Sequence, residues 1–329
     1  MTLLQVTDLR VEAPGSPVLR GVSFSIGAGE RVGLIGESGS GKTMAALAVM
    51  GLVPGGLTVH GSIRLEGREL VGLGERRYSE LRGDRVAMVF QEPMTALDPL
   101  MRVGRQIQDA IRLHRRLTRG QTRERMLELM ARVGFANPRE QARRFPHQLS
   151  GGQRQRIVIA IALACDPALI LADEPTTALD VTVQAQVLVL LQRLVAEQGS
   201  ALLLISHDLA VVSSVCERVL VMYGGTLVEA APTPAILSGP RHPYTLALLQ
   251  TSAAISAASR APAGHLATIP GSVPALGKFP AGCVFRGRCP REQPHCQQTP
   301  PLTGDGHQFA CWYPVDPARA ADLRVQGGP

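Results

Sequence analysis

Aromatic residues are scarce in this chain, in which Phe, Trp and Tyr occupy only 4% of 329 positions. Apolar residues still make up 45%, so a core must be built from Leu, Val, Ile and Ala. Long apolar runs are also missing. The longest, residues 157–165, is far shorter than the ~20 residues needed to cross a bilayer. The first residues lack the basic start and apolar middle of a signal peptide, and we therefore expect a cytosolic protein.

The charge balance of the chain is basic. It has 34 Lys and Arg against 27 Asp and Glu, which gives a formal net charge of +7. A basic surface can attract nucleic acid, anionic lipid or a nucleotide. The arginines are scattered, however, and their densest group, between residues 112 and 125, is interleaved with apolar residues like a solvated helix face. We therefore expect an ordinary arginine-rich surface and no nucleic-acid partner.

The order of the apolar patterns predicts an α/β fold. Continuous apolar runs at residues 168–172 and 201–206 are expected of parallel strands that are buried on both faces. Helical spacing of Leu and Met covers residues 102–144. This alternation indicates a doubly wound α/β core with an inserted helical subdomain. Further strands are predicted at 3–11, 18–26 and 31–35, and a helix at 42–51.

The character of the chain changes near residue 240. Beyond this point Pro and Gly become frequent, and four of the six cysteines follow. We predict a large domain over residues 1–240 and a small loop-rich domain over residues 241–329, with the boundary between about 230 and 261. The helical insertion in the large domain is expected at about residues 92–165.

A glycine-rich loop carries the strongest motif. Residues 36–43 read GESGSGKT, follow an apolar strand and open a helix, which is the context of a P-loop. Its backbone N–H groups and the helix N-terminus are expected to bind phosphate. Lys42 then reaches the β- and γ-phosphates of ATP, and Thr43 ligates Mg²⁺. The predicted nucleotide-binding residues are Gly36, Ser38, Gly39, Ser40, Gly41, Lys42 and Thr43.

Two carboxylates end the apolar run at residues 169–172. Asp173 is expected to hold Mg²⁺ through water. Successive strand residues point in different directions, so Glu174 can face the γ-phosphate and polarise the attacking water as a general base. An Asp-Glu pair after an apolar run is often a simple strand end, but the P-loop upstream favours the catalytic interpretation.

A second glycine-rich helix start occurs at residues 149–153, which read LSGGQ. Ser150 can cap the helix that follows, while Gly151 and Gly152 leave backbone N–H groups accessible to phosphate. The pentapeptide resembles the signature of the ABC ATPase family. The resemblance implies that two such subunits pair head to tail. Ser150, Gly151, Gly152 and Gln153 would then bind ATP that is held by the P-loop of the other subunit.

Three more segments resemble ABC ATPase motifs, in the expected order. Gln91 matches the Q-loop, which implies a catalytic role at Mg²⁺ and the attacking water and coupling to a membrane subunit. Residues 178–180 match the D-loop at the dimer interface. His207 matches the switch histidine, which implies a contact with the γ-phosphate. The resemblance covers roughly residues 3–229 and implies a P-loop ABC ATPase core with an antiparallel β subdomain and a helical subdomain.

One feature of the family is absent from the sequence. ABC ATPases commonly place an aromatic residue before the second strand, where it stacks on adenine. The corresponding position here is Ala13, which has no ring. Adenine is expected to pack on Val18 and neighbouring aliphatic residues instead, and nucleobase selectivity is expected to be weak.

Segments outside the shared motifs resemble one subfamily. FQEPMTALDP, DVTVQAQ and PRHPYTL, which start at residues 90, 180 and 240, are similar to the D-type ATPase of oligopeptide and dipeptide importers. This implies two integral membrane permease subunits, a second related ABC ATPase as heterodimer partner, and an extracytoplasmic substrate-binding protein. The chain itself would be peripheral, on the cytoplasmic face of the inner (plasma) membrane.

Two alternatives stay open at this point. Importers of nickel and glutathione use the same machinery, so the sequence leaves the cargo undecided. A soluble ABC ATPase outside transport is the other alternative. Soluble ABC proteins generally carry two cassettes or a very long coiled-coil insertion, whereas this chain has one cassette and a short helical insertion.

The six cysteines fall into two groups. Cys165 and Cys216 lie in apolar surroundings, as expected of core residues. The other four lie in a loop-rich segment with few large apolar side chains, which favours a metal that holds the segment together. Spacing alone favours zinc over iron–sulfur, with unused thiols as a further alternative, whereas the importer resemblance implies a [4Fe–4S] cluster. This second group is Cys283, Cys289, Cys296 and Cys311.

Overall fold

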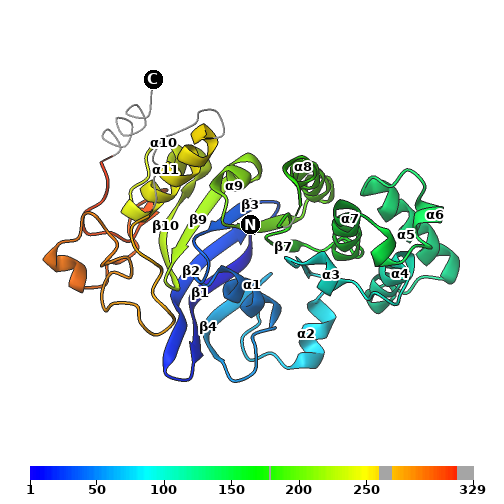
Figure 1. Cartoon of the computed structure of the whole chain (residues 1–329). Helices are drawn as coiled ribbons and strands as arrows, with labels where there is room; N and C mark the ends of the chain where they lie inside the picture. Colours follow the sequence, from blue (N-terminus) through cyan, green and yellow to red (C-terminus); the bar gives the residue numbers. More distant parts are fainter. Residues whose placement is uncertain (178, 259–268, 317–329) are drawn as a thin grey trace.

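The structure is a computed structural model that describes residues 1–177, 179–258 and 269–316. Two β-sheets form its centre (Figure 1). One is antiparallel and has the order β2-β1-β4-β5. Its strands are β1 (Thr2–Ala13), β2 (Ser16–Gly27), β4 (Thr58–Leu65) and β5 (Arg68–Glu69).

The second sheet has seven strands in the order β11-β10-β9-β3-β8-β7-β6. The five strands from β9 to β6 are parallel, while β10 and β11 are antiparallel to their neighbours. Buried, nearly continuous apolar runs form the parallel strands, as the sequence predicted for two of them. The seven strands are β3 (Arg31–Ile35), β6 (Val86–Val89), β7 (Leu169–Asp173), β8 (Ala201–Ser206), β9 (Arg218–Tyr223), β10 (Thr226–Pro232) and β11 (Gln308–Phe309).

The seven-stranded sheet separates two apolar cores. Adjacent residues of β8 point to opposite faces, so Leu204 belongs to the core shared with the helical region and Leu203 to the core shared with the antiparallel sheet. Of three further helices, the first two pack at the second core, whereas the third packs at the first core against β3 and β8. They are α1 (Lys42–Met50), α2 (Glu75–Leu81) and the short α9 (Leu209–Val215).

The predicted helical insertion forms a group of helices beside the sheet, drawn in green on the right of Figure 1. Helical spacing was expected across residues 102–144, and the structure breaks this stretch into three helices. Thr118 caps the second of them: its hydroxyl accepts from the Gln121 N–H, and the Gln121 side chain accepts from the Thr118 N–H. The elements of the insertion are α3 (Pro93–Ala96), α4 (Val103–His114), α5 (Arg119–Arg132), α6 (Pro138–Gln141) and α7 (Gly151–Ala162). Helix α8 (Val181–Gln198) comes after β7, outside the predicted insertion, and packs against α7.

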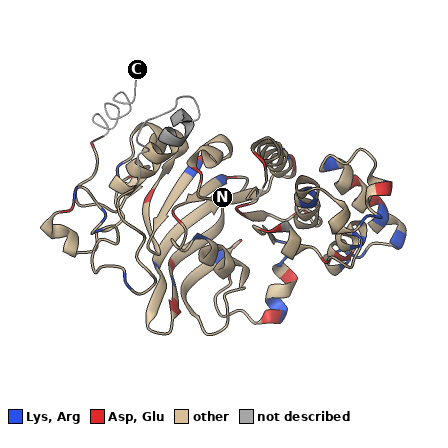
Figure 2. Ribbon diagram, in the orientation of Figure 1, with Lys and Arg blue, Asp and Glu red and all other residues tan. Residues whose placement is uncertain are grey.

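Charged residues gather on these outer helices, whereas the parallel strands of the seven-stranded sheet carry few of them (Figure 2). Many of the arginines have acidic neighbours. Arg105 pairs with Asp109 at 2.8 Å, and Arg125 pairs with Asp166 at 2.7 Å. Acidic side chains therefore balance part of the basic charge on these helices. In the described part of the chain, no helix combines the length and the apolar character that a membrane span requires.

The scarce aromatic residues concentrate where the last part of the chain packs against the sheet. The Tyr223 ring lies 4.7 Å from the Tyr244 ring, 5.2 Å from Phe285 and 5.9 Å from Phe279, measured between centroids. Tyr244 belongs to α11 (Pro243–Ala258), which follows α10 (Thr233–Ser238). The backbone of Phe309 in β11 pairs with that of Glu229 in β10. The domain boundary at residue 240 stays a prediction. The contacts of Tyr223 and Glu229 with later residues join the two sides of that boundary.

Candidate functional site

The P-loop joins β3 to α1, and two of its glycines are required by close packing. A Cβ at Gly36 would come within 2.2 Å of the Met222 carbonyl oxygen. Gly41 has a φ of 97°, and a Cβ there would approach the Leu19 side chain to 2.6 Å. Any other residue would push the loop away from the sheet. These glycines therefore allow the backbone conformation in which the N–H groups of the P-loop point towards the phosphate site.

Lys42 is buried beneath this loop. Its Nζ donates to the carbonyl oxygen of Gly36 at 2.7 Å and to that of Glu37 at 3.0 Å. Burial lowers the pKa of the Lys42 ammonium, while the carboxylates of Glu174 and Asp173 act in the opposite direction. The loop thus holds a cation among backbone dipoles, as the binding of a triphosphate requires.

Asp173 ends β7 directly below the P-loop, and its side chain is almost fully buried. Burial raises the pKa of Asp173, and a hydrogen bond with the side chain of Thr43 opposes that shift. Within the described residues, Asp173 Oδ1 has no hydrogen-bond partner. A buried, unpartnered carboxylate oxygen next to a hydroxyl fits Mg²⁺, which prefers oxygen ligands and usually binds proteins through one or two carboxylates.

Glu174 lies at the centre of a hydrogen-bonded cluster. Its carboxylate lies 3.1 Å from Nδ1 of His207 and accepts hydrogen bonds from the Thr177 hydroxyl at 2.9 Å and from Gln91 Nε2 at 3.4 Å. Burial alone would raise its pKa, but the bonds from His207 and Thr177 outweigh burial and lower the pKa of Glu174. The carboxylate is therefore ionised near neutral pH and able to accept a proton.

The backbone holds this cluster in place. The Glu174 N–H donates to the Ile205 carbonyl oxygen at 2.9 Å, which ties the end of β7 to β8 immediately before His207. Thr177 was missed at the level of sequence, although a hydroxyl three residues after the glutamate was a usable signal.

A cleft of about 1110 Å³ brings most of the predicted phosphate-binding and catalytic residues together, although Ser40 and Asp173 are not among the residues that line it. The P-loop forms part of its lining, and Gln91, Glu174 and His207 form another part. Residues that were not predicted also contribute, namely Leu248 and Thr251 of α11 and the segment around Val273 and Leu276. Ala13 is not part of the lining, whereas Val18 is. The structure thus assembles the expected phosphate and catalytic groups in one space.

The signature residues do not reach this cleft. Ser150 caps α7: its hydroxyl accepts from the Gln153 N–H at 3.3 Å, and its own N–H donates to Gln153 Oε1 at 3.1 Å. A Cβ at Gly152 would meet the Val183 side chain at 2.5 Å, so α8 packs closely against the start of α7. The capped helix N-terminus therefore lies apart from the P-loop of its own chain.

The D-loop lies next to the signature helix. Ala178 lies outside the described residues. Leu179 reaches towards α7, since a Cβ at Gly151 would lie 3.2 Å from its side chain. Asp180 caps α8 by accepting from the Val183 N–H at 2.9 Å. The contact joins the segment that follows Glu174 to the helix that carries Ser150.

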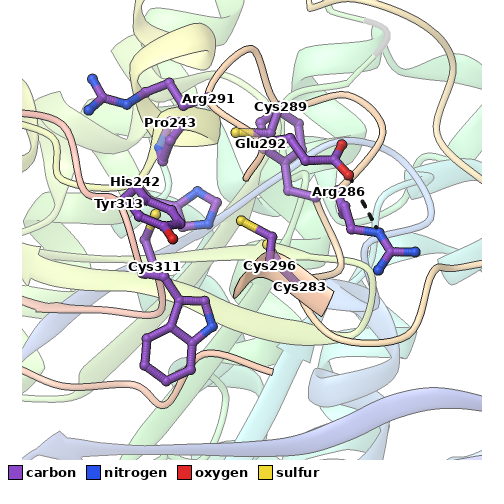
Figure 3. Close-up of a pocket in the computed structure, with 12 residues that line it drawn as sticks. His242, Pro243, Cys283, Arg286, Cys289, Arg291, Glu292, Cys296, Cys311 and Tyr313 are labelled. Atoms are coloured by element: carbon purple, nitrogen blue, oxygen red, sulfur yellow. Dashed lines mark ion pairs between the residues drawn. The ribbon is translucent and has the colours of Figure 1, made fainter. Parts of the chain in front are cut away.

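The prediction of a metal at the C-terminal cysteines is wrong. Among the described residues, no group of three or more His, Cys, Asp or Glu side chains is placed to hold a metal ion. All four cysteines line one small pocket with His242 and Trp312 (Figure 3), but all four are free. Burial raises the pKa of the Cys289 thiol to about 11 and that of Cys311 to about 12, so these thiols are protonated near neutral pH.

The reason lies in what holds this segment together. A metal was expected on the premise that residues 261–329 must be stabilised from within. In the structure, the described part of this range, residues 269–316, packs on the buried aromatic surface of the core, where Phe285 contacts Tyr223 and Tyr244. The Cys283 N–H also donates to the Cys296 carbonyl oxygen at 2.9 Å. Apolar contacts with the rest of the chain therefore stabilise the segment, a role that was expected of a metal bound by the four cysteines.

An ion pair ties this C-terminal segment to the P-loop. The buried Arg288 guanidinium donates to both carboxylate oxygens of Glu37, at 2.6 and 3.1 Å, and to the Tyr223 hydroxyl at 3.1 Å. The Glu37 N–H in turn donates to the Tyr244 hydroxyl at 2.7 Å. The hydrogen bonds with Glu37 raise the pKa of Arg288, which stays charged. A bidentate, partly desolvated pair of this kind is expected to be strong.

A double-mutant cycle is expected to detect this pair. Arg288→Met and Glu37→Gln should show a coupling free energy of unfolding of about 1–3 kcal/mol, because either change leaves the partner's charge partly buried. The exposed Arg105–Asp109 pair on α4 is the control and should give under about 1 kcal/mol. Denaturant unfolding of the wild type, the four single variants and the two double variants measures both values. Equal coupling in the two pairs would contradict a special role for Arg288.

Comparisons with known proteins agree with this geometry. Residues 19–177 match the family model described as "ABC transporter". Residues 228–296 match the model described as "Oligopeptide/dipeptide transporter, C-terminal region". The first match spans the P-loop, Gln91, the LSGGQ segment and Glu174, and the second spans the start of the C-terminal segment.

Curated relatives extend the similarity over nearly the whole chain. The dipeptide transport ATP-binding protein DppD of Escherichia coli is 42% identical over 97% of this chain and 98% of its own length. The oligopeptide transport ATP-binding protein OppD of Salmonella typhimurium is 41% identical over 95% of this chain and 94% of its own length. Among solved structures, an ATP-binding cassette dimer in a post-hydrolysis state with bound ADP and Pi superposes with a TM-score of 0.62. It has 28% identity and covers 70% of this chain and 99% of its own.

Proposed function

Because this chain belongs to the family of ATP-binding subunits of ABC transporters, we propose that it hydrolyses ATP to drive the import of oligopeptides or dipeptides. The observation that carries the proposal is the ionised Glu174 carboxylate, held by three side chains in the cleft that the P-loop lines. The match of residues 228–296 to the peptide-transporter model and the names of the relatives support the cargo class.

Glu174 is the general base in this proposal. Thr177 and His207 orient its carboxylate, so that it can take the proton of a water that attacks the γ-phosphate. Gln91, bonded to the same carboxylate, is placed to orient that water. Lys42 and the N–H groups of residues 36–43 hold the phosphates. Bound Mg²⁺ would neutralise phosphate charge, and Thr43 and Asp173 are the residues that would hold it.

The position of the signature supports a subunit that works in a pair. Ser150 and its neighbours lie outside the cleft of their own chain, so they are free to bind ATP held by another subunit. We infer that the partner is a second, related ABC ATPase. Two integral membrane permeases and an extracytoplasmic binding protein would complete an importer of this class. The chain would then lie on the cytoplasmic face of the plasma membrane, and residues 241–329 would form an appended domain.

Reconstitution into proteoliposomes tests the proposal. The chain is combined with its second ATPase, its two permeases and the binding protein, and uptake of a labelled di- or oligopeptide is measured. We expect uptake that depends on ATP. When the chain is assayed alone, we expect only a small fraction of the ATPase rate of the complex, because its LSGGQ segment then has no ATP on a partner subunit to bind.

Three results would contradict parts of this proposal. Uptake of nickel or glutathione without peptide would overturn the cargo. A stable homodimer of this chain with the full ATPase rate would overturn the heterodimer. Failure to assemble with membrane permeases would favour a soluble ABC ATPase outside transport.

A further inference from the structure

One part of the ATP cleft is made by residues outside the P-loop cassette. Ile269, Val273 and Leu276 line the cleft together with Val18 of β2. Leu276 is 52% exposed, although it is a large apolar side chain. An apolar side chain that faces a cleft gains stability when an apolar ligand surface covers it. Its place in the cleft therefore indicates a ligand group with an apolar face.

The segment 271–277 packs against the start of β2. A Cβ at Gly277 would come within 2.4 Å of the Ser16 hydroxyl, so the backbone next to Leu276 lies directly on that strand. Val18, two residues further along β2, adjoins the P-loop, since its carbonyl oxygen lies 3.5 Å from a Cβ built at Gly41. The segment thus lies beside the turn that follows Ala13, where the family has its aromatic residue.

Both ends of the segment are fixed. Arg288 Nε donates to the Pro270 carbonyl oxygen at 2.8 Å while the same guanidinium binds Glu37 of the P-loop. At the other end, the Phe279 ring packs edge-on against Tyr223, and Arg20 lies 5.6 Å from its centroid. Arg288 therefore acts as a positioning residue that holds segment 271–277 at a set distance from the phosphate-binding loop.

We propose that segment 271–277 forms the nucleobase wall of the ATP site, with Val273 and Leu276 contacting the purine ring in place of an aromatic residue. This inference rests on the proposed ATP binding. The phosphates are held by the P-loop, and Glu174 and His207 lie in the part of the cleft assigned to the γ-phosphate. The purine then needs an apolar surface elsewhere in the same cleft. Val18, Val273 and Leu276 supply it, and aliphatic side chains offer no hydrogen-bond pattern for base discrimination.

Calorimetric titration of the full chain tests the wall with two ligands that share phosphates but differ in the base. They are ATP and inorganic tripolyphosphate, each with Mg²⁺. The double variant Val273→Ser, Leu276→Ser should bind ATP about tenfold more weakly, because apolar contact with the ring is lost. Its affinity for tripolyphosphate should stay unchanged, which also shows that the P-loop is still folded.

Two control variants accompany this test. Leu276→Met keeps an apolar side chain and should bind ATP like the wild type. Leu113→Ser makes the same chemical change at an exposed residue of α4 outside the cleft, and it should also bind both ligands normally.

The outcomes separate this inference from the proposed function. Unchanged ATP affinity in the double Ser variant, or equal weakening of ATP and tripolyphosphate, would overturn the nucleobase wall alone. A wild-type chain that binds neither ligand would overturn the ATP site itself, and the wall with it. Loss of ATP affinity in Leu113→Ser would also count against the wall, because the effect would then not depend on the cleft.

Discussion

Replacing Glu174 with Gln is expected to abolish steady-state ATP hydrolysis while ATP still binds. The amide keeps the size of the side chain and can still meet Thr177 and His207, but it cannot accept the proton of the attacking water. General-base catalysis typically contributes about 10²–10⁴-fold, so the rate of the assembled transporter should fall by at least about a hundredfold. Phosphate release measures the rate, and calorimetry measures ATP affinity.

Glu80→Gln is the matched control for this variant. Glu80 is an exposed glutamate of α2, remote from the cleft lining, and its substitution should leave hydrolysis unchanged. A Glu174→Gln transporter that hydrolyses ATP at the wild-type rate would refute the role of Glu174. Loss of ATP binding in the same variant would instead indicate a part in holding the nucleotide.

Replacing Lys42 with Ala is expected to weaken ATP binding by about 10- to 100-fold. The variant removes a charge-assisted contact to the phosphates, and hydrogen bonds to charged groups contribute about 1.5–3 kcal/mol. The affinity for tripolyphosphate should fall to the same extent, whereas the double Ser variant of segment 271–277 should keep its affinity for tripolyphosphate. Calorimetric titration of both ligands measures the effect.

The stability of the Lys42→Ala variant provides a check on its folding. Burial lowers the pKa of Lys42, so the charged ammonium is held in the fold at a cost in desolvation. The unfolding temperature should therefore stay the same or rise. A chain that binds ATP normally without Lys42 would remove this residue from the site, and a large drop in unfolding temperature would assign it a structural role.

Much of the fold could be predicted from local patterns. The apolar runs that became β3, β7 and β8 are buried on both faces, and the fold class and the ATP-hydrolysing activity are confirmed by the comparisons. These features depend on residues that lie close together in sequence, such as the turn of the P-loop between a strand and a helix. The roles of individual site residues stay predictions until the variants are measured.

The C-terminal segment could not be predicted in the same way. Its four cysteines suggested a metal because the segment is poor in apolar residues, but stability also depends on what the rest of the chain offers. Tyr223 and Tyr244 come from a strand and a helix of the preceding part, and no spacing rule connects them with Phe285. Only the packed structure shows that burial keeps the Cys311 thiol protonated, and that no group of side chains in the described range is placed to hold a metal.

The sequence by itself determined the phosphate-binding loop, the two carboxylates at the end of β7 and the second glycine-rich helix start, because each is a local motif with a fixed backbone geometry. Only the tertiary structure decided that Arg288 binds Glu37, 251 positions away, and that Leu276 lines the ATP cleft. The physical reason is that such contacts depend on how two apolar surfaces meet after the sheet has formed. The local sequence around either residue therefore does not predict the contact between them.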